Sequence, residues 1–229
     1  MEKNIKYYLI HGVDASRKPR MEEEFRKWGL ADKNVNWMIY PNKGDITPQL
    51  YHSIVNQQQS WSCGTYVHPN SLVLGVVSCT YKHYLSLKNI VESDAEYGVI
   101  MEDNMYYTKN VPERVEKYID QLNDFHPGWD ILFDSAWKSY AEINESPLIS
   151  GRLVYPKSNV MNEHGHGGTR CAQFYIVTKE CARKMVERYL PFNNAPDWYM
   201  NDLLRDLNLQ SFWGEPSIAH IFPHVSTAT

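Results

Sequence analysis

The sequence predicts an α/β fold with a mostly parallel central sheet flanked by helices. Short apolar runs of strand length alternate with amphipathic runs of helical length along most of the 229 residues. Several of the apolar runs are followed directly by glycine, proline or acidic residues, which mark their ends. Such alternation is typical of doubly wound sheets, which bind ligands at the carboxyl ends of their strands. We expect one domain covering residues 1–229.

The first half of the chain shows this alternation most clearly. Residues 5–13 form an apolar and aromatic run closed by Gly12, and Met21, Phe25 and Trp28 then follow at helical spacing. The segment that precedes residue 71 is polar and favours a loop. The elements predicted here are strands at 5–13, 35–40 and 97–101, and helices at 14–30, around 51–58 and at 71–93.

The second half continues in the same order. Pro112 lies at the start of an amphipathic run, where the first turn of a helix tolerates proline. The elements predicted here are strands at 129–134, 147–156, 172–178 and 211–216, and helices at 111–123, 179–190 and 197–208.

The amino-acid composition limits the kinds of binding partner and the cellular compartment that we expect. The formal net charge is -4, from 23 Lys and Arg against 27 Asp and Glu, so no global basic field favours nucleic acid or an anionic membrane. The four cysteines are irregularly spaced and fit reduced thiols in a cytosolic protein. No apolar run is long enough for a membrane span. We therefore expect a cytoplasmic protein that binds no nucleic acid and does not span a membrane.

An acidic triplet follows the predicted strand at 97–101. Glu102, Asp103 and Asn104 all offer oxygen atoms at the end of a strand, where α/β sheets place their ligands. Hard oxygen ligands suit Mg²⁺ or Mn²⁺, which could bridge the triplet to a diphosphate. Acidic turns also follow strands without any metal, so the triplet alone leaves both interpretations open.

The sequence around the triplet, GVVSCTYKHYLSLKNIVESDAEYGVIMEDN at 75–104, resembles the signature block of glycosyltransferase family 25. That family includes bacterial lipooligosaccharide galactosyltransferases and collagen galactosyltransferases. Residues 78–79 and 82–83 stand at its Gly-Cys-x-x-Ser-His positions, and 102–104 at its Glu-Asp-Asp positions. A second block at 168–185 and the stretch around Asp197 are also similar to the family, so the resemblance spans about residues 5–226.

Two departures from the family pattern affect the expected chemistry. Asn104 replaces the last acid of the triplet, and Lys82 replaces the serine before His83. Asparagine keeps an acceptor oxygen but loses a charge, which predicts a weaker metal site. The placement of Gly75, Ser78 and Leu87 also differs from the family's usual glycines and tryptophan.

The resemblance implies a GT-A (Rossmann-like) fold and a metal-dependent inverting transferase. Its donor would be a UDP-hexose carrying glucose or galactose, and its acceptor a hydroxyl of a glycan or of a protein, collagen-like proteins included. The cofactor would be Mn²⁺ or Mg²⁺, which stabilises charge on the leaving diphosphate. The metal ligands that we expect are Asp103, Asn104 and His220, although a histidine near a terminus is equally often plain surface.

The general base and the donor site have candidates of their own. Asp197 would take the proton from the acceptor hydroxyl, while its position after Pro196 is equally that of a helix N-cap. Arginines would bind phosphate, unless they are solvated charges, and His83 would contact the donor or neighbouring groups, unless it is a core residue. The expected donor-binding residues are Ile10, His11, Gly12, Val13, Arg17, Arg20, His83, Glu102, Asp103, Gly168 and Thr169.

The stretch NEHGHGGTR at 162–170 favours a glycine-rich loop that closes over the substrate. A zinc site at His164 and His166 is the less favoured interpretation, because only Glu163 accompanies them. Asn104 and Lys82 keep open a second function, a nucleotide-sugar-binding module with weak or no catalysis. A phosphate-ester hydrolase would need more carboxylates or histidines at strand ends than the sequence offers.

Overall fold

A seven-stranded mixed sheet forms the centre of the protein, for which we describe a computed structural model. The described residues are 3–30, 34–56, 62–63, 66–67, 72–108, 110–134, 147–159 and 172–221. The sheet has the order β2-β1-β5-β9-β7-β10-β8. Its strands are β1 (Ile5–Ile10), β2 (Val35–Met38), β5 (Tyr97–Glu102), β7 (Ile131–Phe133), β8 (Val154–Pro156), β9 (Phe174–Thr178) and β10 (Ser211–Gly214).

Five of these seven strands run in the same direction. Strand β1 is parallel to β2 and β5, and β7 is parallel to β10, whereas β9 is antiparallel to both β5 and β7 and β8 is antiparallel to β10. Two small antiparallel pairs lie outside this sheet, namely β3 (Ser62–Cys63) with β4 (Tyr66–Val67) and β6 (Met105–Tyr107) with β11 (Ala219–Ile221). The predicted α/β class with a mostly parallel central sheet is confirmed, while the extent of one domain over residues 1–229 stays a prediction.

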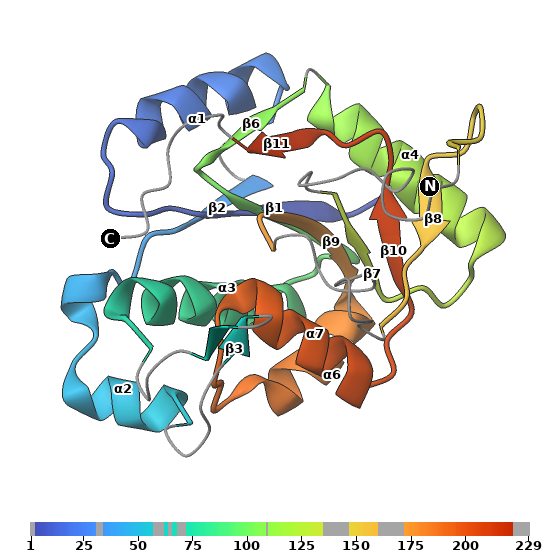
Figure 1. Cartoon of the computed structure of the whole chain (residues 1–229). Helices are drawn as coiled ribbons and strands as arrows, with labels where there is room; N and C mark the ends of the chain where they lie inside the picture. The colour runs from blue at the N-terminus through green and yellow to red at the C-terminus, as the bar shows by residue number, and fades with distance from the viewer. Residues whose placement is uncertain are drawn as a thin grey trace.

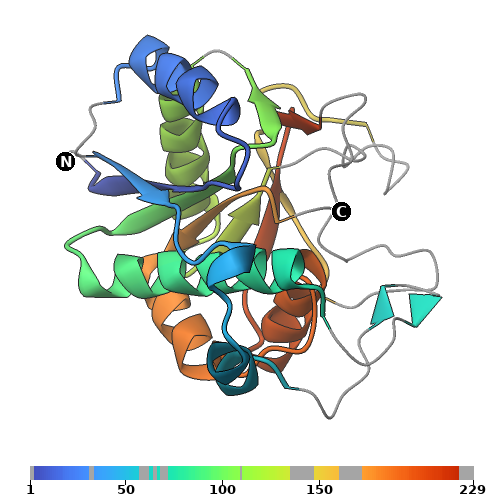
Figure 2. The ribbon, with the colours of Figure 1, turned by 90° about the vertical axis from the view of Figure 1, so that its left-hand side faces the viewer.

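Helices cover both faces of the sheet, as predicted. Helices α1 and α4 lie on one face, and α3, α6 and α7 lie on the other (Figures 1 and 2). The bounds are α1 (Arg17–Lys27), α2 (Pro48–Ile54), α3 (Leu74–Glu92), α4 (Val111–Phe125), α6 (Lys179–Tyr189) and α7 (Pro196–Asp206), with a short 3-10 helix at Lys43–Asp45.

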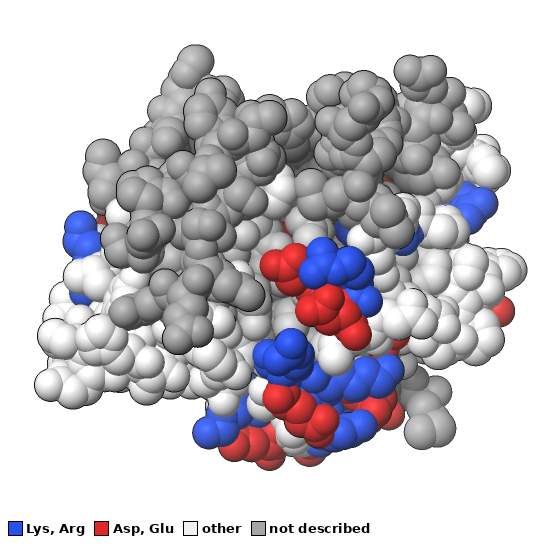
Figure 3. All heavy atoms as spheres, turned by 60° about the horizontal axis from the view of Figure 1, so that its bottom comes forward, with Lys and Arg blue, Asp and Glu red and all other residues white. Residues whose placement is uncertain are grey.

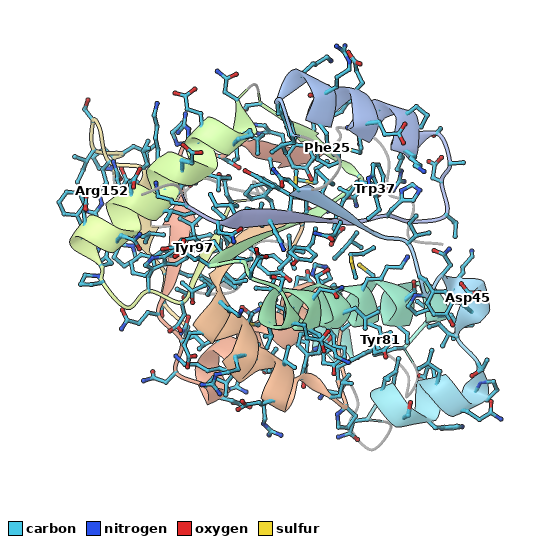
Figure 4. The ribbon with its side chains drawn as sticks, turned by 180° about the vertical axis from the view of Figure 1, so that it is seen from behind. Phe25, Trp37, Asp45, Tyr81, Tyr97 and Arg152 are labelled. Carbon is cyan, nitrogen blue, oxygen red and sulfur yellow. The ribbon has the colours of Figure 1, made fainter. Side chains whose placement is uncertain are left out.

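The hydrophobic core is divided by the sheet because successive side chains of a strand point to opposite faces. Along β1, Tyr7 and Leu9 pack with α1 and α4, whereas Tyr8 and Ile10 pack with α3, α6 and α7. On the first face, Phe25 of α1 meets Trp37 of β2 edge to face, with ring centroids 5.8 Å apart (Figure 4). This contact fixes α1, and with it the loop that leaves the end of β1.

Several boundaries differ from those that the sequence predicts. The helix expected around 51–58 begins earlier, at Pro48, because the Thr47 side chain accepts the Leu50 N–H and proline occupies the first turn. The strand expected at 147–156 is limited to its last three residues. The pair of β6 and β11 was not predicted, since three residues are too few for a recognisable alternation.

Charges of both signs lie together on the face of the molecule shown in Figure 3. On α6, Arg183 pairs with Glu180 and Glu187, and on α7 Arg205 pairs with Asp202. Such exposed pairs within a helix contribute little to stability, but they keep the two signs interspersed. Within the described parts of the chain, no helix is long and apolar enough to cross a membrane.

Gly98 of β5 provides a test of the packing between β5 and α3. A Cβ atom at residue 98 would lie 2.1 Å from Ile90 Cδ1 and 2.5 Å from Ile90 Cγ1. We therefore expect Gly98→Ala to lower the free energy of unfolding by about 1–3 kcal/mol, measured by urea denaturation. The loss should shrink in an Ile90→Ala background, and equal losses in both backgrounds would contradict the contact. Gly75→Ala is the control, because a Cβ there meets nothing within 4 Å.

Candidate functional site

The carboxyl ends of β1 and β5 lie side by side and carry most of the residues that the sequence singled out. Ile10 is the register partner of Glu102, and the Asp103 N–H donates a hydrogen bond of 3.1 Å to the Ile10 carbonyl oxygen. His11 and Gly12 therefore leave the sheet directly beside the acidic triplet. Among the other predicted donor contacts, Val13 is exposed, and Gly168 and Thr169 lie outside the described residues.

Asp103 is the centre of this group and is only 3% exposed. Its Oδ2 lies 2.6 Å from His11 Nδ1 and accepts the Gly12 N–H at 3.1 Å. Its Oδ1 accepts a hydrogen bond of 3.1 Å from Arg17 Nη1. Each oxygen of a carboxylate has two lone pairs, so Oδ1 retains the capacity to bind a further group.

Two further positively charged side chains, Arg20 and Lys82, donate hydrogen bonds to backbone oxygens at the ends of β1 and β5. Arg20 donates to the carbonyl oxygens of Asp103 and Met105, the second at 2.7 Å. Lys82, 2% exposed, donates to the His11 carbonyl oxygen at 2.7 Å and to Asn42 Oδ1 at 3.0 Å. Burial lowers the pKa of Lys82, and the charges of Cys79 and Asp103 act in the opposite direction. The lysine that replaces the family's serine thus ties α3 to the end of β1.

Glu102, on the other side of the triplet, faces α3. Its Oε1 lies 3.3 Å from His83 Nε2 and 3.9 Å from Cys79 Sγ. The His83 ring is fully buried, and its Nδ1 lies 2.9 Å from the Tyr175 hydroxyl of β9. Burial, followed by the nearby charge of Glu102, raises the pKa of the Cys79 thiol. His83 therefore contacts a residue of the acidic triplet, as well as being a core residue.

Asp197 lies in the first turn of α7, but it is not the cap. The N-cap residue is Ala195, so the N-cap interpretation of Asp197 is wrong: Pro196 already occupies the first helical position. The Asp197 Oδ1 accepts the Trp198 N–H at 3.0 Å. Burial raises the pKa of Asp197, the charge of Glu102 raises it further, and His83 lowers it. Helix α7 packs on the same face of the sheet as α3, which carries His83.

The residues expected to bind a metal ion are only partly assembled. Asn104 Oδ1 is buried and has no hydrogen-bond partner among the described residues. A buried amide oxygen without a partner, at the residue that follows Asp103 in the sequence, suits a hard cation. His220 is exposed on β11, where it is the register partner of Tyr106 on β6. The hydrogen bonds and ion pairs of the described residues do not join His220 to Asp103 or Asn104. The oxygen atoms of Asp103 and Asn104 thus suit Mn²⁺ or Mg²⁺, whereas His220 lies on β11, the strand that pairs with β6.

Asp134 is a buried acid that the sequence reasoning did not single out. It follows β7 and accepts hydrogen bonds from the Tyr118 hydroxyl at 2.6 Å and the Ile218 N–H at 2.8 Å. Burial raises the pKa of Asp134 to about 7. The sequence does contain a pattern that indicates Asp134, because this acid follows an apolar strand just as Glu102 and Asp103 do.

This shift predicts a pH dependence of stability. Because the folded pKa exceeds the unfolded one, the folded protein holds a proton between about pH 4 and pH 7 that the unfolded chain has released. The Asp134 contribution is therefore present at the acid end and is lost as pH rises through about 7, by roughly 4 kcal/mol. Urea denaturation of wild type and Asp134→Asn at pH 5 and pH 8 should show roughly 3 kcal/mol of this loss, because pH 5 already lies inside the window and the other groups are common to both proteins. A stability difference between the two proteins that does not change with pH would contradict the assignment.

Three solved structures align with most of this chain at low sequence identity. A197 from STIV is 12% identical, covers 96% of this chain and 86% of that chain, and has a TM-score of 0.46. Mouse xyloside xylosyltransferase 1, apo form, is 12% identical, with 90% and 71% covered and a TM-score of 0.41. CMP:2-keto-3-deoxy-manno-octonic acid synthetase complexed with CTP is 11% identical, with 95% and 93% covered and a TM-score of 0.42. Similarities this weak carry no information about the reaction.

The sequence itself matches a family over most of its length. No curated protein sequence gave a match. The family described as glycosyltransferase family 25 (LPS biosynthesis protein) matches residues 2–200. This range includes β1, the acidic triplet, α3 and Asp197, so the resemblance noted from short motifs is confirmed. The chain belongs to glycosyltransferase family 25.

Proposed function

We propose that the protein is a metal-dependent inverting glycosyltransferase that moves glucose or galactose from a UDP-sugar to a hydroxyl group of a glycan or a protein. The observation that carries the proposal is the meeting of the β1 and β5 ends, where buried Asp103 is held by His11, Gly12 and Arg17. Carboxyl ends of strands are where α/β sheets bind nucleotides. Family membership supplies the class of reaction.

The donor would lie against the loop that leaves β1. Gly12 has nothing within 4 Å of the place where a Cβ would be, so its backbone is open to close approach by a ribose or base. Arg17 supplies positive charge beside Asp103 and would bind a diphosphate oxygen. Mn²⁺ or Mg²⁺ held by Asp103 and Asn104, with His220 as a further ligand, would stabilise the negative charge that develops on the leaving diphosphate.

Asp197 would act as the general base. Its carboxylate would accept the proton of the acceptor hydroxyl while that oxygen forms the new bond to the sugar carbon. The bond between the sugar carbon and the diphosphate oxygen breaks on the opposite face, and UDP leaves with the electron pair. The raised pKa of Asp197 suits this role, because a stronger base takes the proton more readily.

A panel of nucleotide sugars tests this proposal. UDP-glucose and UDP-galactose should bind, more tightly with Mn²⁺ than without it, and should release UDP slowly by hydrolysis, whereas ADP- and GDP-sugars should not. Binding without turnover would instead support a nucleotide-sugar-binding module. The contacts of Asp103 support that alternative, because Arg17 and His11 already bind its carboxylate oxygens. If no UDP-sugar binds with or without Mn²⁺, both versions fail.

Asn104→Asp tests the metal position directly. Replacing the orphaned amide oxygen with a carboxylate adds a negative charge next to Asp103 and should tighten Mn²⁺ binding in the presence of UDP. Lys82 already donates to His11 and Asn42, which favours this result over a new pair between Lys82 and residue 104. Calorimetric titration of Mn²⁺ measures the change. Unchanged or weaker binding would mean that residue 104 does not face the ion.

A further inference from the structure

Cys79, His83 and Glu102 bring three different metal-binding atoms together beside the acidic triplet. Cys79 and His83 are four residues apart on α3 and therefore share one face of the helix, and Glu102 ends the adjacent strand β5. The thiol sulfur, an imidazole nitrogen and a carboxylate oxygen lie within 4.8 Å of one another. The proposed glycosyl transfer assigns no role to the thiol.

The two separations from Glu102 are close to the edges of a small tetrahedron. Zinc binds sulfur at about 2.3 Å and nitrogen or oxygen at about 2.0–2.2 Å, so its tetrahedral ligands lie roughly 3.3–3.7 Å apart. The observed distances are 3.3 Å between His83 Nε2 and Glu102 Oε1, and 3.9 Å between Cys79 Sγ and the same oxygen. The third separation, between Cys79 Sγ and the His83 imidazole, is within 4.8 Å. Side-chain movements of up to about 1 Å would therefore place all three atoms around one ion.

The surroundings already orient these ligands. His83 Nδ1 lies 2.9 Å from the Tyr175 hydroxyl, a partner that can accept the Nδ1 proton and leave the Nε2 lone pair for a metal. The Glu102 backbone is fixed by the Tyr107 hydroxyl, which donates to its carbonyl oxygen at 2.6 Å. His83 is fully buried, while the Glu102 side chain keeps 14% exposure. Glu102 therefore provides a side from which an ion can enter.

We propose that Cys79, His83 and Glu102 form a binding site for Zn²⁺, distinct from the oxygen site at Asp103 and Asn104. A thiolate and an imidazole select zinc over Mn²⁺ and Mg²⁺, which prefer oxygen ligands. Three protein ligands leave the fourth tetrahedral position open to water or another ligand. On binding, the Cys79 thiol loses its proton to solvent and its sulfur forms the bond to zinc.

The test uses the reduced full-length chain under anaerobic conditions, with Zn²⁺ titrated against a chromophoric chelator. Wild type should bind one Zn²⁺ at this site, and Co²⁺ in its place should give a thiolate charge-transfer band with the intense visible bands of tetrahedral cobalt. Cys79→Ser should lose the thiolate band and weaken zinc binding by at least about 100-fold. Cys181→Ala, which removes a buried cysteine of α6, should change neither property.

A second measurement works on the wild-type protein and does not depend on a variant that folds. Zn²⁺ should slow alkylation of Cys79 by iodoacetamide, with each cysteine followed separately by mass spectrometry, and excess Mn²⁺ should not. Protection by Zn²⁺ without protection by Mn²⁺ separates this site from the proposed manganese site. The proposal is overturned if zinc leaves Cys79 alkylation unchanged, or if Cys79→Ser and wild type bind zinc equally well.

Discussion

Asp103→Ala is expected to lower the free energy of unfolding by about 3–5 kcal/mol. The substitution removes the carboxylate that the Gly12 N–H and Arg17 Nη1 both contact, although Arg17 keeps its pair with Asp14. Removing one partner from a buried ion pair costs about this much. The same variant should lose the Mn²⁺-dependent part of UDP-hexose binding. Denaturant unfolding and calorimetric titration measure the two effects separately.

Asp14→Ala is the matched control for this prediction. Asp14 also pairs with Arg17, at 3.2 Å from Nε, but its carboxylate is much more exposed than that of Asp103. Removal of Asp14 should leave stability and donor binding close to those of wild type. Similar losses in the two variants would mean that the burial of Asp103 is not what makes its ion pair important.

Asp197→Asn should reduce glycosyl transfer by about 100-fold or more while donor affinity and melting temperature stay close to wild type. Asparagine keeps an oxygen that can accept the Trp198 N–H, so the local structure is preserved, whereas it cannot accept the acceptor's proton. Since Ala195 is the N-cap, a loss of capping cannot explain a loss of activity. Single-turnover kinetics with a UDP-hexose and an acceptor measure the effect.

The pH dependence of the transfer rate tests the role of Asp197 as general base in a second way. A base must be deprotonated to act, and burial raises the pKa of Asp197, so the acid limb of the rate profile should lie above the range of an ordinary aspartate. Asp202→Asn, a change on the same helix at a residue paired with Arg205, should keep both the rate and this limb. Normal turnover by Asp197→Asn would exclude Asp197 as the base.

The sequence predicted the long elements of the fold because their apolar patterns are repeated several times. It placed α3 and β5 well, since the 19-residue helix is followed after residues 93–96 by the uncharged run 97–101, which makes up the strand up to Glu102. The antiparallel direction of β9 was not predicted, because a strand buried on both faces has the same composition in either direction. Strands β6 and β11 depend on pairing between distant segments, which no local pattern records.

The candidate site was predicted in its position and only partly in its contacts. Strand ends in an α/β sheet meet at one edge, so His11 and Asp103 could be expected to lie together. That the Asp103 carboxylate binds three protein groups could not be predicted, because rotamers and hydrogen bonds form only in the folded chain. Lys82 illustrates the same limit, since its residue type does not reveal that it bonds to a backbone oxygen of β1's loop.

Arg17 and Arg20, at the start of α1, contact the turn after β5 in two different ways. Arg20 grips the turn after β5 through the carbonyl oxygens of Asp103 and Met105, whereas Arg17 reaches that turn through the Asp103 carboxylate. A phosphate that competes for Arg17 therefore leaves both backbone bonds of Arg20 intact. Helix α1 would stay docked while Arg17 changed partner, so the binding and release of such a ligand would need a side-chain rearrangement and no movement of a helix.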